Sequence, residues 1–266
     1  MLDKLEAMTS PQKLTTCINE LLEKEAPIQE SRNYLGASIL GVDCLRALQF
    51  GYTSTPKDDG RDFNDKILRI FEAGHLFEDL CVNWLRRAGF EIQTEDENGE
   101  QLGFSLADGR IQGHVDGIIL AAPDNLDLLT PMLWECKSLN HRSWKDTVEN
   151  GLAKSKPIYA AQIAIYQAHM EILQSPVIQP ALFTAVNKNS AELYHELIPF
   201  DSKLAQHSID KANSVLKATD NNELLGATRS NYNCKFCAWQ DRCDKEDNGS
   251  PTWLDFMNNN RKDPLS

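Results

Sequence analysis

Long apolar runs are missing from this sequence of 266 residues. No stretch approaches the roughly 20 uninterrupted apolar residues that a membrane-spanning helix needs. The first dozen residues also lack a basic segment followed by an apolar one, so we expect no secretory signal peptide. The sequence therefore predicts a cytoplasmic protein with no membrane attachment.

Basic residues are in short supply. The chain has 27 Lys and Arg residues against 39 Asp and Glu residues, which gives a formal net charge of −12 at pH 7. This balance argues against a protein whose whole surface is a positive field for nucleic acid. It is compatible with a local basic groove, and with a site where carboxylates hold cations that then meet phosphates.

The periodicity of apolar residues predicts helices that flank a group of strands. Helical spacing is found in six segments, residues 11–25, 34–52, 64–88 (with an interruption near Gly74), 144–150, 157–173 and 201–218. Short alternating runs over residues 90–138 predict an antiparallel strand meander, and two more strands are expected over 181–187 and 192–198. The order favours an α/β (α+β) fold with a mixed β-sheet core flanked by helices. The polar tail beyond Trp253 is expected to be mobile.

Two carboxylates and a lysine are expected to meet on one face of this sheet. Glu135 and Lys137 are two residues apart in a strand, so their side chains project from the same side while Cys136 points away. If residues 110–119 pair antiparallel with that strand, Asp116 comes beside Glu135. Such a group can hold a hard divalent cation through oxygen atoms while the lysine orients a water or stabilises phosphoryl charge. An exposed cross-strand ion pair with a turn carboxylate is the alternative interpretation.

Two predicted helices add polar residues near this group. Glu78 follows His75 by three residues, so the two side chains share a face of the upstream helix. Gln162 and Tyr166 are four residues apart on the helix that follows the strand, and they share a face in the same way.

The order of four short motifs resembles that of the PD-(D/E)XK nuclease superfamily, specifically its RecB-like exonuclease branch. The motifs are G-x-x-x-E (Gly74 to Glu78), G-x-x-D (Gly113 to Asp116), E-x-K (Glu135 to Lys137) and Q-x-x-x-Y (Gln162 to Tyr166). The resemblance implies a restriction-endonuclease-like domain over residues 34–243. An N-terminal helical extension (1–33) precedes this domain, and a C-terminal tail (244–266) follows it.

The resemblance also implies a metal-dependent deoxyribonuclease, an exonuclease on single-stranded DNA or DNA ends. In that family the Asp and Glu bind Mg²⁺ or Mn²⁺ and the Lys assists the attacking water, roles that carry over to Asp116, Glu135 and Lys137. The middle residue of E-x-K lends its carbonyl to the metal in relatives, and this residue is Cys136 here.

The remaining family positions concern the first motif and the last. In the first motif relatives use either Glu or His near the metal, so Glu78 and His75 are both candidates for the remaining ligand. The Gln and Tyr of the last motif lie beside the site and help hold the nucleic-acid strand in relatives, which implies that role for Gln162 and Tyr166.

Seven cysteines are an odd number for a disulfide framework, and ligands or buried thiols explain them better. Cys234, Cys237 and Cys243 are close enough in sequence to converge on one metal centre. No His or Cys follows them, so a fourth ligand must come from far upstream. Buried structural thiols are expected at the three cysteines outside this set, Cys17, Cys81 and Cys136.

The local pattern around Cys44 resembles the segment that donates the N-terminal cysteine in iron-sulfur members of the RecB-like branch, the CRISPR-associated and AddB-type nucleases. The resemblance therefore implies a 4Fe-4S cluster held by Cys44, Cys234, Cys237 and Cys243. A zinc site with the same four thiolates is the alternative. Either centre would clip the N-terminal helical region to the C-terminal end of the domain.

A locally basic segment spans residues 137–156, with five basic residues against two acidic ones. His141 and Trp144 interleave with these charges, as in a track for single-stranded DNA. A solvated connector with Trp144 packed into the core is the alternative.

Two kinds of partner follow from these features. DNA is the expected substrate, and a protein of recombination, repair, phage or CRISPR-type DNA processing is the expected partner that delivers it. A non-catalytic nucleic-acid-binding or recombination-complex subunit that keeps the fold and the metal cluster is the alternative function.

Overall fold

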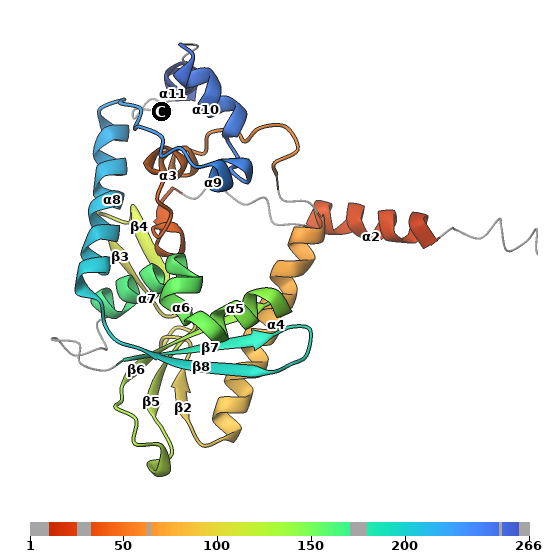
Figure 1. Ribbon diagram of the computed structural model, residues 1–266, viewed down its shortest axis with the longest axis vertical. Helices are drawn as coiled ribbons and strands as arrows, with labels where there is room; N and C mark the ends of the chain where they lie inside the picture. The colour runs from red at the N-terminus through yellow and green to blue at the C-terminus, as the bar shows by residue number, and fades with distance from the viewer. Residues whose placement is uncertain (1–10, 26–32, 63–64, 171–179, 250–251, 261–266) are drawn as a thin grey trace, which may run out of the picture.

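Two β-sheets form the centre of the protein, seen here in a computed structural model that describes residues 11–25, 33–62, 65–170, 180–249 and 252–260 (Figure 1). The larger sheet has the order β2-β5-β6-β7-β8, with β2 (Glu91–Gln93), β5 (Gly117–Ala121), β6 (Met132–Leu139), β7 (Ala181–Asn187) and β8 (Leu193–Ile198). In it, β6 and β7 are parallel and the other neighbours are antiparallel. The smaller sheet has the order β1-β4-β3, with β1 (Leu35–Gly36), β4 (Ile111–His114) and β3 (Gly103–Leu106).

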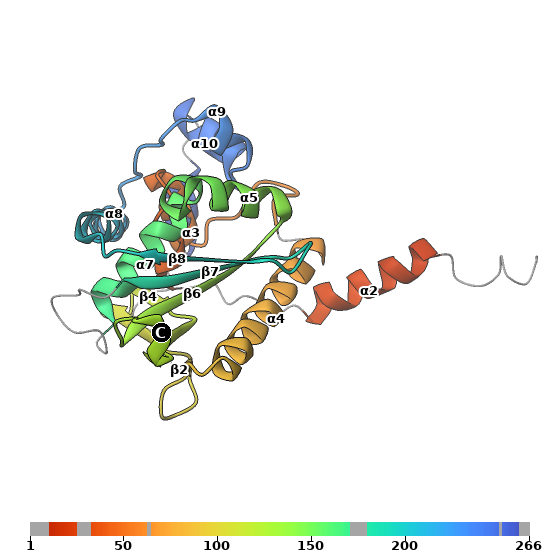
Figure 2. The ribbon, with the colours of Figure 1, turned by 60° about the horizontal axis from the view of Figure 1, so that its bottom comes forward.

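Helices cover both faces of the larger sheet. The connection between the parallel strands β6 and β7 runs through α5 (His141–Asn150), α6 (Leu152–Ser155) and α7 (Pro157–His169). Figure 2 shows α5 and α7 on one side of this sheet and the long helix α4 (Asp65–Arg87) on the other. Because both faces are covered, β7 is buried at every position, as expected for a central strand.

Alternate residues of β6 belong to two different cores. Leu133 and Leu139 pack with α7 and with α8 (Ser202–Asp220), whereas Trp134 and Cys136 pack with α4. The side chains of Glu135 and Lys137 therefore project on the α7 side, as the period of two in a strand requires.

A third region joins a helix from the first quarter of the chain to the C-terminal helices. Helix α3 (Leu45–Tyr52) lies beside α9 (Asn231–Lys235), α10 (Gln240–Asp247) and α11 (Trp253–Asn260) at one end of the molecule (Figure 1). Phe50, Cys243 and Trp253 form its small buried core. Helix α2 (Pro11–Glu25) projects from the N-terminal end of α4, where Asn19 accepts a hydrogen bond from Arg69. Among the helices that the structure describes, none is long and apolar enough to span a membrane.

The predicted mixed sheet core flanked by helices is confirmed, but the strand meander was too simple. Val115 and Asp116 interrupt the strand between β4 and β5, and these two strands belong to different sheets. A continuous strand over residues 110–119 is therefore wrong, although β5 does pair antiparallel with β6 as expected.

Two predicted helices also need correction. Residues 34–52 do not form one helix, because Leu35 and Gly36 pair with Ile111 and Gln112 of β4 and a 3-10 turn (Ala37–Ile39) follows. Helix α4 runs through Gly74 without the expected interruption. A single helical glycine costs about 1 kcal/mol, which the burial of the apolar face of α4 outweighs.

The mobile tail predicted beyond Trp253 is wrong for residues 253–260, which form α11. Trp253 is 1% exposed, and its indole Nε1 donates a hydrogen bond to Thr53 Oγ1 at 3.3 Å. The tail was predicted to begin at residue 244, which lies inside α10, and α10 continues to Asp247. Residues 157–173 were predicted to be helical, but α7 ends at His169. Residues 171–173 lie outside the described residues.

Candidate functional site

A cleft of about 700 Å³ opens where the two sheets meet α4 and α7. Five of the residues predicted from sequence line it, namely His75, Glu78, Asp116, Gln162 and Tyr166. Glu135 is fully buried directly behind these residues, where it contacts Gln162.

Asp116 lies at the break between β4 and β5, where the two sheets separate. Its Oδ2 accepts a hydrogen bond from the backbone N–H of Cys136 at 2.7 Å, and this bond ties the break to the middle of β6. The ammonium of Lys137 lies 3.8 Å from the same oxygen and forms an ion pair with Glu135 Oε1. The structure therefore brings Asp116, Glu135 and Lys137 together.

Glu135 is the fully buried carboxyl group of the site. Its Oε1 accepts hydrogen bonds from Lys137 and from Gln162 Nε2, the latter at 2.7 Å, and Gln162 also donates to the Tyr166 hydroxyl at 3.1 Å. Its Oε2 is buried and has no hydrogen-bond partner among the described residues. Burial, reinforced by the negative charge of Asp116, raises the pKa of Glu135 to about 8.

Lys137 stays protonated in this setting. Burial lowers its pKa, but the negative charges of Glu135 and Asp116 outweigh burial, so the net shift raises the pKa of Lys137. Its ammonium also lies 5.5 Å from the centre of the Tyr159 ring, within the range of a cation–π contact.

Glu78 and His75, the two candidates of the first motif, differ in their surroundings. Burial and the negative charge of Asp116 raise the pKa of Glu78 to about 7, against the opposing charge of Lys137. Glu78 is thus electrostatically part of the carboxylate group. His75 lines the same cleft one helical turn earlier, and its side chain is exposed.

The donor groups at the cleft fit a divalent cation. Ionised together, the three carboxyl groups would exceed the charge of the one ammonium, and the raised pKa values of Glu135 and Glu78 reflect the lack of a compensating cation. Oε2 of Glu135, unpartnered among the described residues, is an oxygen ligand of the kind that Mg²⁺ and Mn²⁺ prefer. Within the described ranges, no three His, Cys, Asp or Glu side chains already stand as a finished metal site. Cation binding therefore requires the carboxylates to draw closer together.

The glycine of the G-x-x-D motif has a steric explanation. A Cβ atom at Gly113 would lie 2.5 Å from the Phe104 ring and 2.7 Å from the Tyr166 ring. These two rings pack edge to face with centroids 5.9 Å apart. Only glycine at residue 113 therefore allows Tyr166 to lie against β4 beside the cleft.

Some of the cleft-lining residues were missed by the sequence reasoning. Arg86 lines the cleft two helical turns after Glu78, and the spacing along α4 could have indicated it. Tyr34 and Gln112 come from the β1-β4 pair, for which the sequence gives no signal because β1 has only two residues.

The basic segment is not part of this cleft, since no residue of 141–156 lines it. Trp144 packs against the main core, and its Nε1 donates to the carbonyl of Ala185 at 3.2 Å. Trp144 is therefore half-buried against the core, as the alternative interpretation of this segment expects, and DNA binding by the segment stays a prediction. Two of the lysines are paired as well, Lys145 with Glu149 and Lys156 with Asp146.

The four cysteines predicted as ligands line one small cavity between α3, α9 and α10. Cys44 precedes α3, Cys234 lies in α9, Cys237 follows α9 and Cys243 lies in α10. All are free thiols. Burial raises the pKa of Cys237, and the charges of Cys44, Cys243 and Cys234 add to the shift. Four thiols around one cavity are a donor set that a metal cation or an iron-sulfur cluster would bind as thiolates, so the residue types fit such a centre.

The three remaining cysteines follow the expectation only in part. Cys81 and Cys136 are buried together between α4 and β6. Cys17 is exposed, which contradicts the prediction of a buried thiol, because its face of α2 points to solvent.

No protein-family model and no curated protein matches this chain. Among solved structures, it is similar to SSO0001, with 16% identity and a TM-score of 0.47 over 86% of this chain and 96% of that chain. It is also similar to the alkaline exonuclease LHK-Exo from Laribacter hongkongensis, alone and in complex with dAMP. Each of these has 14% identity and a TM-score of 0.49 over 72% of this chain and 90% of that chain. Because identities and TM-scores are this low, we assign no function from these likenesses.

Proposed function

We propose that this protein is a metal-dependent DNA nuclease that hydrolyses phosphodiester bonds as an exonuclease on single-stranded DNA or DNA ends. One observation carries the proposal: the buried Glu135, with one unpartnered oxygen, lies beside Asp116 and Lys137 at a cleft. The match of four motifs to the RecB-like nucleases supports DNA as the substrate.

Each residue of the group has a distinct task in this proposal. Asp116, Glu135 and Glu78 hold Mg²⁺ or Mn²⁺, together with the carbonyl of Cys136. The bound cation supplies positive charge to the phosphate and lowers the pKa of a water. Lys137 is protonated, so it orients the attacking water and offsets developing negative charge, and it does not act as a base.

Gln162 positions Glu135, and Tyr166 closes the wall of the cleft. The amide of Gln162 fixes Oε1 of Glu135, which leaves Oε2 for the metal. The polar side chains that line the rest of the cleft, including Arg86 and Gln112, are available to a DNA strand.

A nuclease assay tests the proposal. Labelled single-stranded and double-stranded DNA, linear and circular, is incubated with the protein and Mg²⁺ or Mn²⁺. We expect degradation of linear DNA, with circles resistant, and a loss of about 100-fold or more in Lys137→Ala and Asp116→Ala. Lys145→Ala is the control, because Lys145 lies outside the cleft and pairs with Glu149 on the surface. Full activity in both cleft variants would reject the site, and DNA binding without cleavage by the wild type would favour the non-catalytic subunit.

We propose in addition that Cys44, Cys234, Cys237 and Cys243 hold a 4Fe-4S cluster. Their position around one cavity and the mutual effect of their charges support a shared centre. Anaerobic purification followed by iron, sulfide and zinc analysis tests this proposal. We expect about four irons per chain in the wild type and a loss of metal in Cys44→Ser. One zinc and no iron would replace the cluster by a zinc site.

A further inference from the structure

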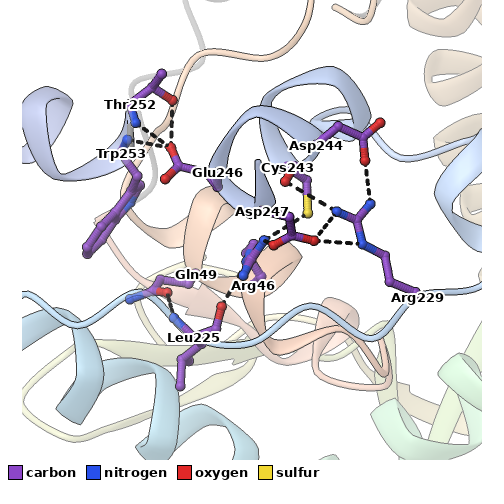
Figure 3. A network of polar contacts seen from close by, with 10 residues as sticks. All are labelled: Arg46, Gln49, Leu225, Arg229, Cys243, Asp244, Glu246, Asp247, Thr252 and Trp253. Atoms are coloured by element: carbon purple, nitrogen blue, oxygen red, sulfur yellow. Dashed lines mark hydrogen bonds and ion pairs between the residues drawn. The ribbon is translucent and has the colours of Figure 1, made fainter. Parts of the chain in front are cut away.

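Arg46 is a buried cation in the region where α3 meets the C-terminal helices. It lies two residues after Cys44 in α3, and 9% of its surface is exposed. Its Nη1 donates hydrogen bonds to Cys243 Sγ at 3.2 Å and to Asp247 Oδ1 at 2.6 Å, and its Nε donates to the Leu225 carbonyl at 2.8 Å (Figure 3).

A second arginine holds the same helix from the other side. Arg229 donates to Asp247 Oδ2 at 3.1 Å through Nε, to Asp244 Oδ1 at 2.7 Å and to the Cys243 carbonyl at 3.2 Å (Figure 3). Asp247 thus bridges both guanidinium groups. The backbone and the carboxylates around Cys243 are therefore fixed by charge-assisted hydrogen bonds, which are stronger than neutral ones.

The segment that receives the Arg46 Nε bond is itself fixed. Gln49, one turn after Arg46, accepts a hydrogen bond from the Leu225 backbone N–H and donates one to the Glu223 carbonyl, both at 2.8 Å. The guanidinium of Arg46 is consequently held on two sides, by the Leu225 carbonyl and by Asp247. Nη1 is thereby placed between Asp247 Oδ1 and Cys243 Sγ and donates to both.

Packing alone does not account for this arrangement. A buried guanidinium costs free energy unless all its partners are in place, and an apolar side chain of similar size would fill the same space at lower cost. Arg46 is also remote from the DNA cleft, since it does not line it. Among the three partners of Arg46, the thiol of Cys243 is the one that belongs to the proposed metal centre.

We propose that Arg46 is the positioning residue of the cysteine centre. Its N–H···S hydrogen bond fixes the direction of Cys243 Sγ and offsets the charge of the thiolate, while Asp247 and Arg229 anchor α10. One ligand of the centre, Cys243 Sγ, is thereby oriented in the metal-free protein, and the metal is retained longer once it is bound. This inference rests on the proposed function of the four cysteines as ligands.

Three variants separate positioning of the sulfur from simple docking of α10. Arg46→Met removes all three hydrogen bonds. Arg46→Lys keeps a positive charge that can pair with Asp247, but it lacks the Nε donor to the Leu225 carbonyl that, with the planar guanidinium, fixes Nη1 between Asp247 and Cys243. Arg242→Met is the matched control, because Arg242 lies in α10 next to Cys243 and its side chain donates hydrogen bonds to Pro56 and Thr252 instead of to a sulfur.

The first measurement is the half-life of bound iron or zinc against a chelator, with the melting temperature of each metal-free variant beside it. We expect Arg46→Met to lose metal 10 to 100 times faster than the wild type, by analogy with other residues that orient metal ligands. Arg46→Lys should recover the melting temperature but not the metal half-life. Wild-type retention in Arg46→Met, or recovery of both quantities in Arg46→Lys, would overturn the assignment.

The second measurement needs no bound metal. The rate of alkylation of Cys243 by iodoacetamide is mapped by mass spectrometry at about pH 10, where a free thiol is ionised without help from an arginine, so that the rate reports access to the sulfur. This rate should rise at least about tenfold in metal-free Arg46→Met and stay near the wild-type rate in Arg242→Met. An unchanged rate in Arg46→Met would also reject the proposal. A wild-type protein that binds neither iron nor zinc would remove the proposed cluster, while this comparison still decides whether Arg46 holds Cys243.

Discussion

The side-chain amide of Gln162 donates a hydrogen bond to Glu135 Oε1 at 2.7 Å, so the helix after the strand fixes one oxygen of the carboxylate. The other oxygen, Oε2, is left buried and unpartnered within the described part of the chain. The carboxylate is therefore held in one orientation by the hydrogen bonds to Oε1 alone. This pairing connects the E-x-K and Q-x-x-x-Y motifs physically, although they come from different elements.

Replacing Gln162 by leucine should weaken metal binding at the cleft. Gln162→Leu removes the donor to Glu135 and to the Tyr166 hydroxyl at nearly constant volume, so only Lys137 still holds Oε1 of Glu135 and the carboxylate is less firmly oriented. We expect nuclease activity at limiting Mg²⁺ to fall 10 to 100 times, with partial recovery at high Mg²⁺. An activity titration against Mg²⁺ measures this effect. Gln206→Leu, on the exposed face of α8, is the control, and the same titration curve for Gln162→Leu and the wild type would contradict the prediction.

The two candidates of the first motif should separate under substitution. Glu78→Gln removes a carboxylate that feels the charges of Asp116 and Lys137, so we expect a loss of about 100-fold or more in activity. His75→Ala alters an exposed side chain on the same helix face, and we expect a loss of less than about tenfold. The two rates, measured at saturating Mn²⁺, decide which residue belongs to the metal shell. The opposite order would assign His75 to it.

The pH dependence of stability should have an unusual sign. The pKa values of Glu135 and Glu78 are raised to about 8 and about 7 from 4.5, so between pH 4.5 and about 8 the folded protein holds protons that the unfolded chain has released. Without divalent cation, the free energy of unfolding should therefore fall as pH rises, by up to about 1.4 kcal/mol per pH unit for Glu135 between pH 4.5 and about 8. Glu78 is partly exposed to solvent, so it adds a smaller slope, between pH 4.5 and about 7.

Urea unfolding at a series of pH values measures this slope. Glu135→Gln should flatten it, because an amide does not ionise, and saturating Mg²⁺ should flatten it in the wild type, because the cation binds the ionised carboxylates. A slope that is identical in Glu135→Gln and the wild type would show that other groups control it.

Alanine at residue 113 should damage both packing and the cleft. Gly113→Ala forces a methyl group against the Phe104 and Tyr166 rings, and overpacking of this kind costs about 1–3 kcal/mol. Gly226→Ala is the matched control, since a Cβ there meets nothing within 4 Å, and we expect a change within about 0.5 kcal/mol. Thermal unfolding compares the two, and equal stability would show that the rings move aside without cost.

The parts of the site that depend on local periodicity could be predicted from sequence. Glu135 and Lys137 share a face because they are two apart in β6, and Gln162 and Tyr166 share one because they are four apart in α7. The rest of the cleft depends on the pairing of β1 with β4, a contact of two residues across a long separation in sequence. No local pattern reports such a pairing, so Tyr34 and Gln112 were missed. Trp144 shows another limit, because the sequence did not indicate whether its ring would pack into the core or face a DNA strand.

The contact between α3 and α10 affects the order in which parts of the chain can fold. Arg46 leaves the ribosome long before Cys243, its partner 197 positions later, and Leu225 follows Arg46 by 179 positions. During synthesis Arg46 stays hydrated until Leu225, Cys243 and Asp247 have all been made. Nascent chains halted before α10 therefore lack the partners that bury this arginine, so this region of the fold forms only after α10 has emerged.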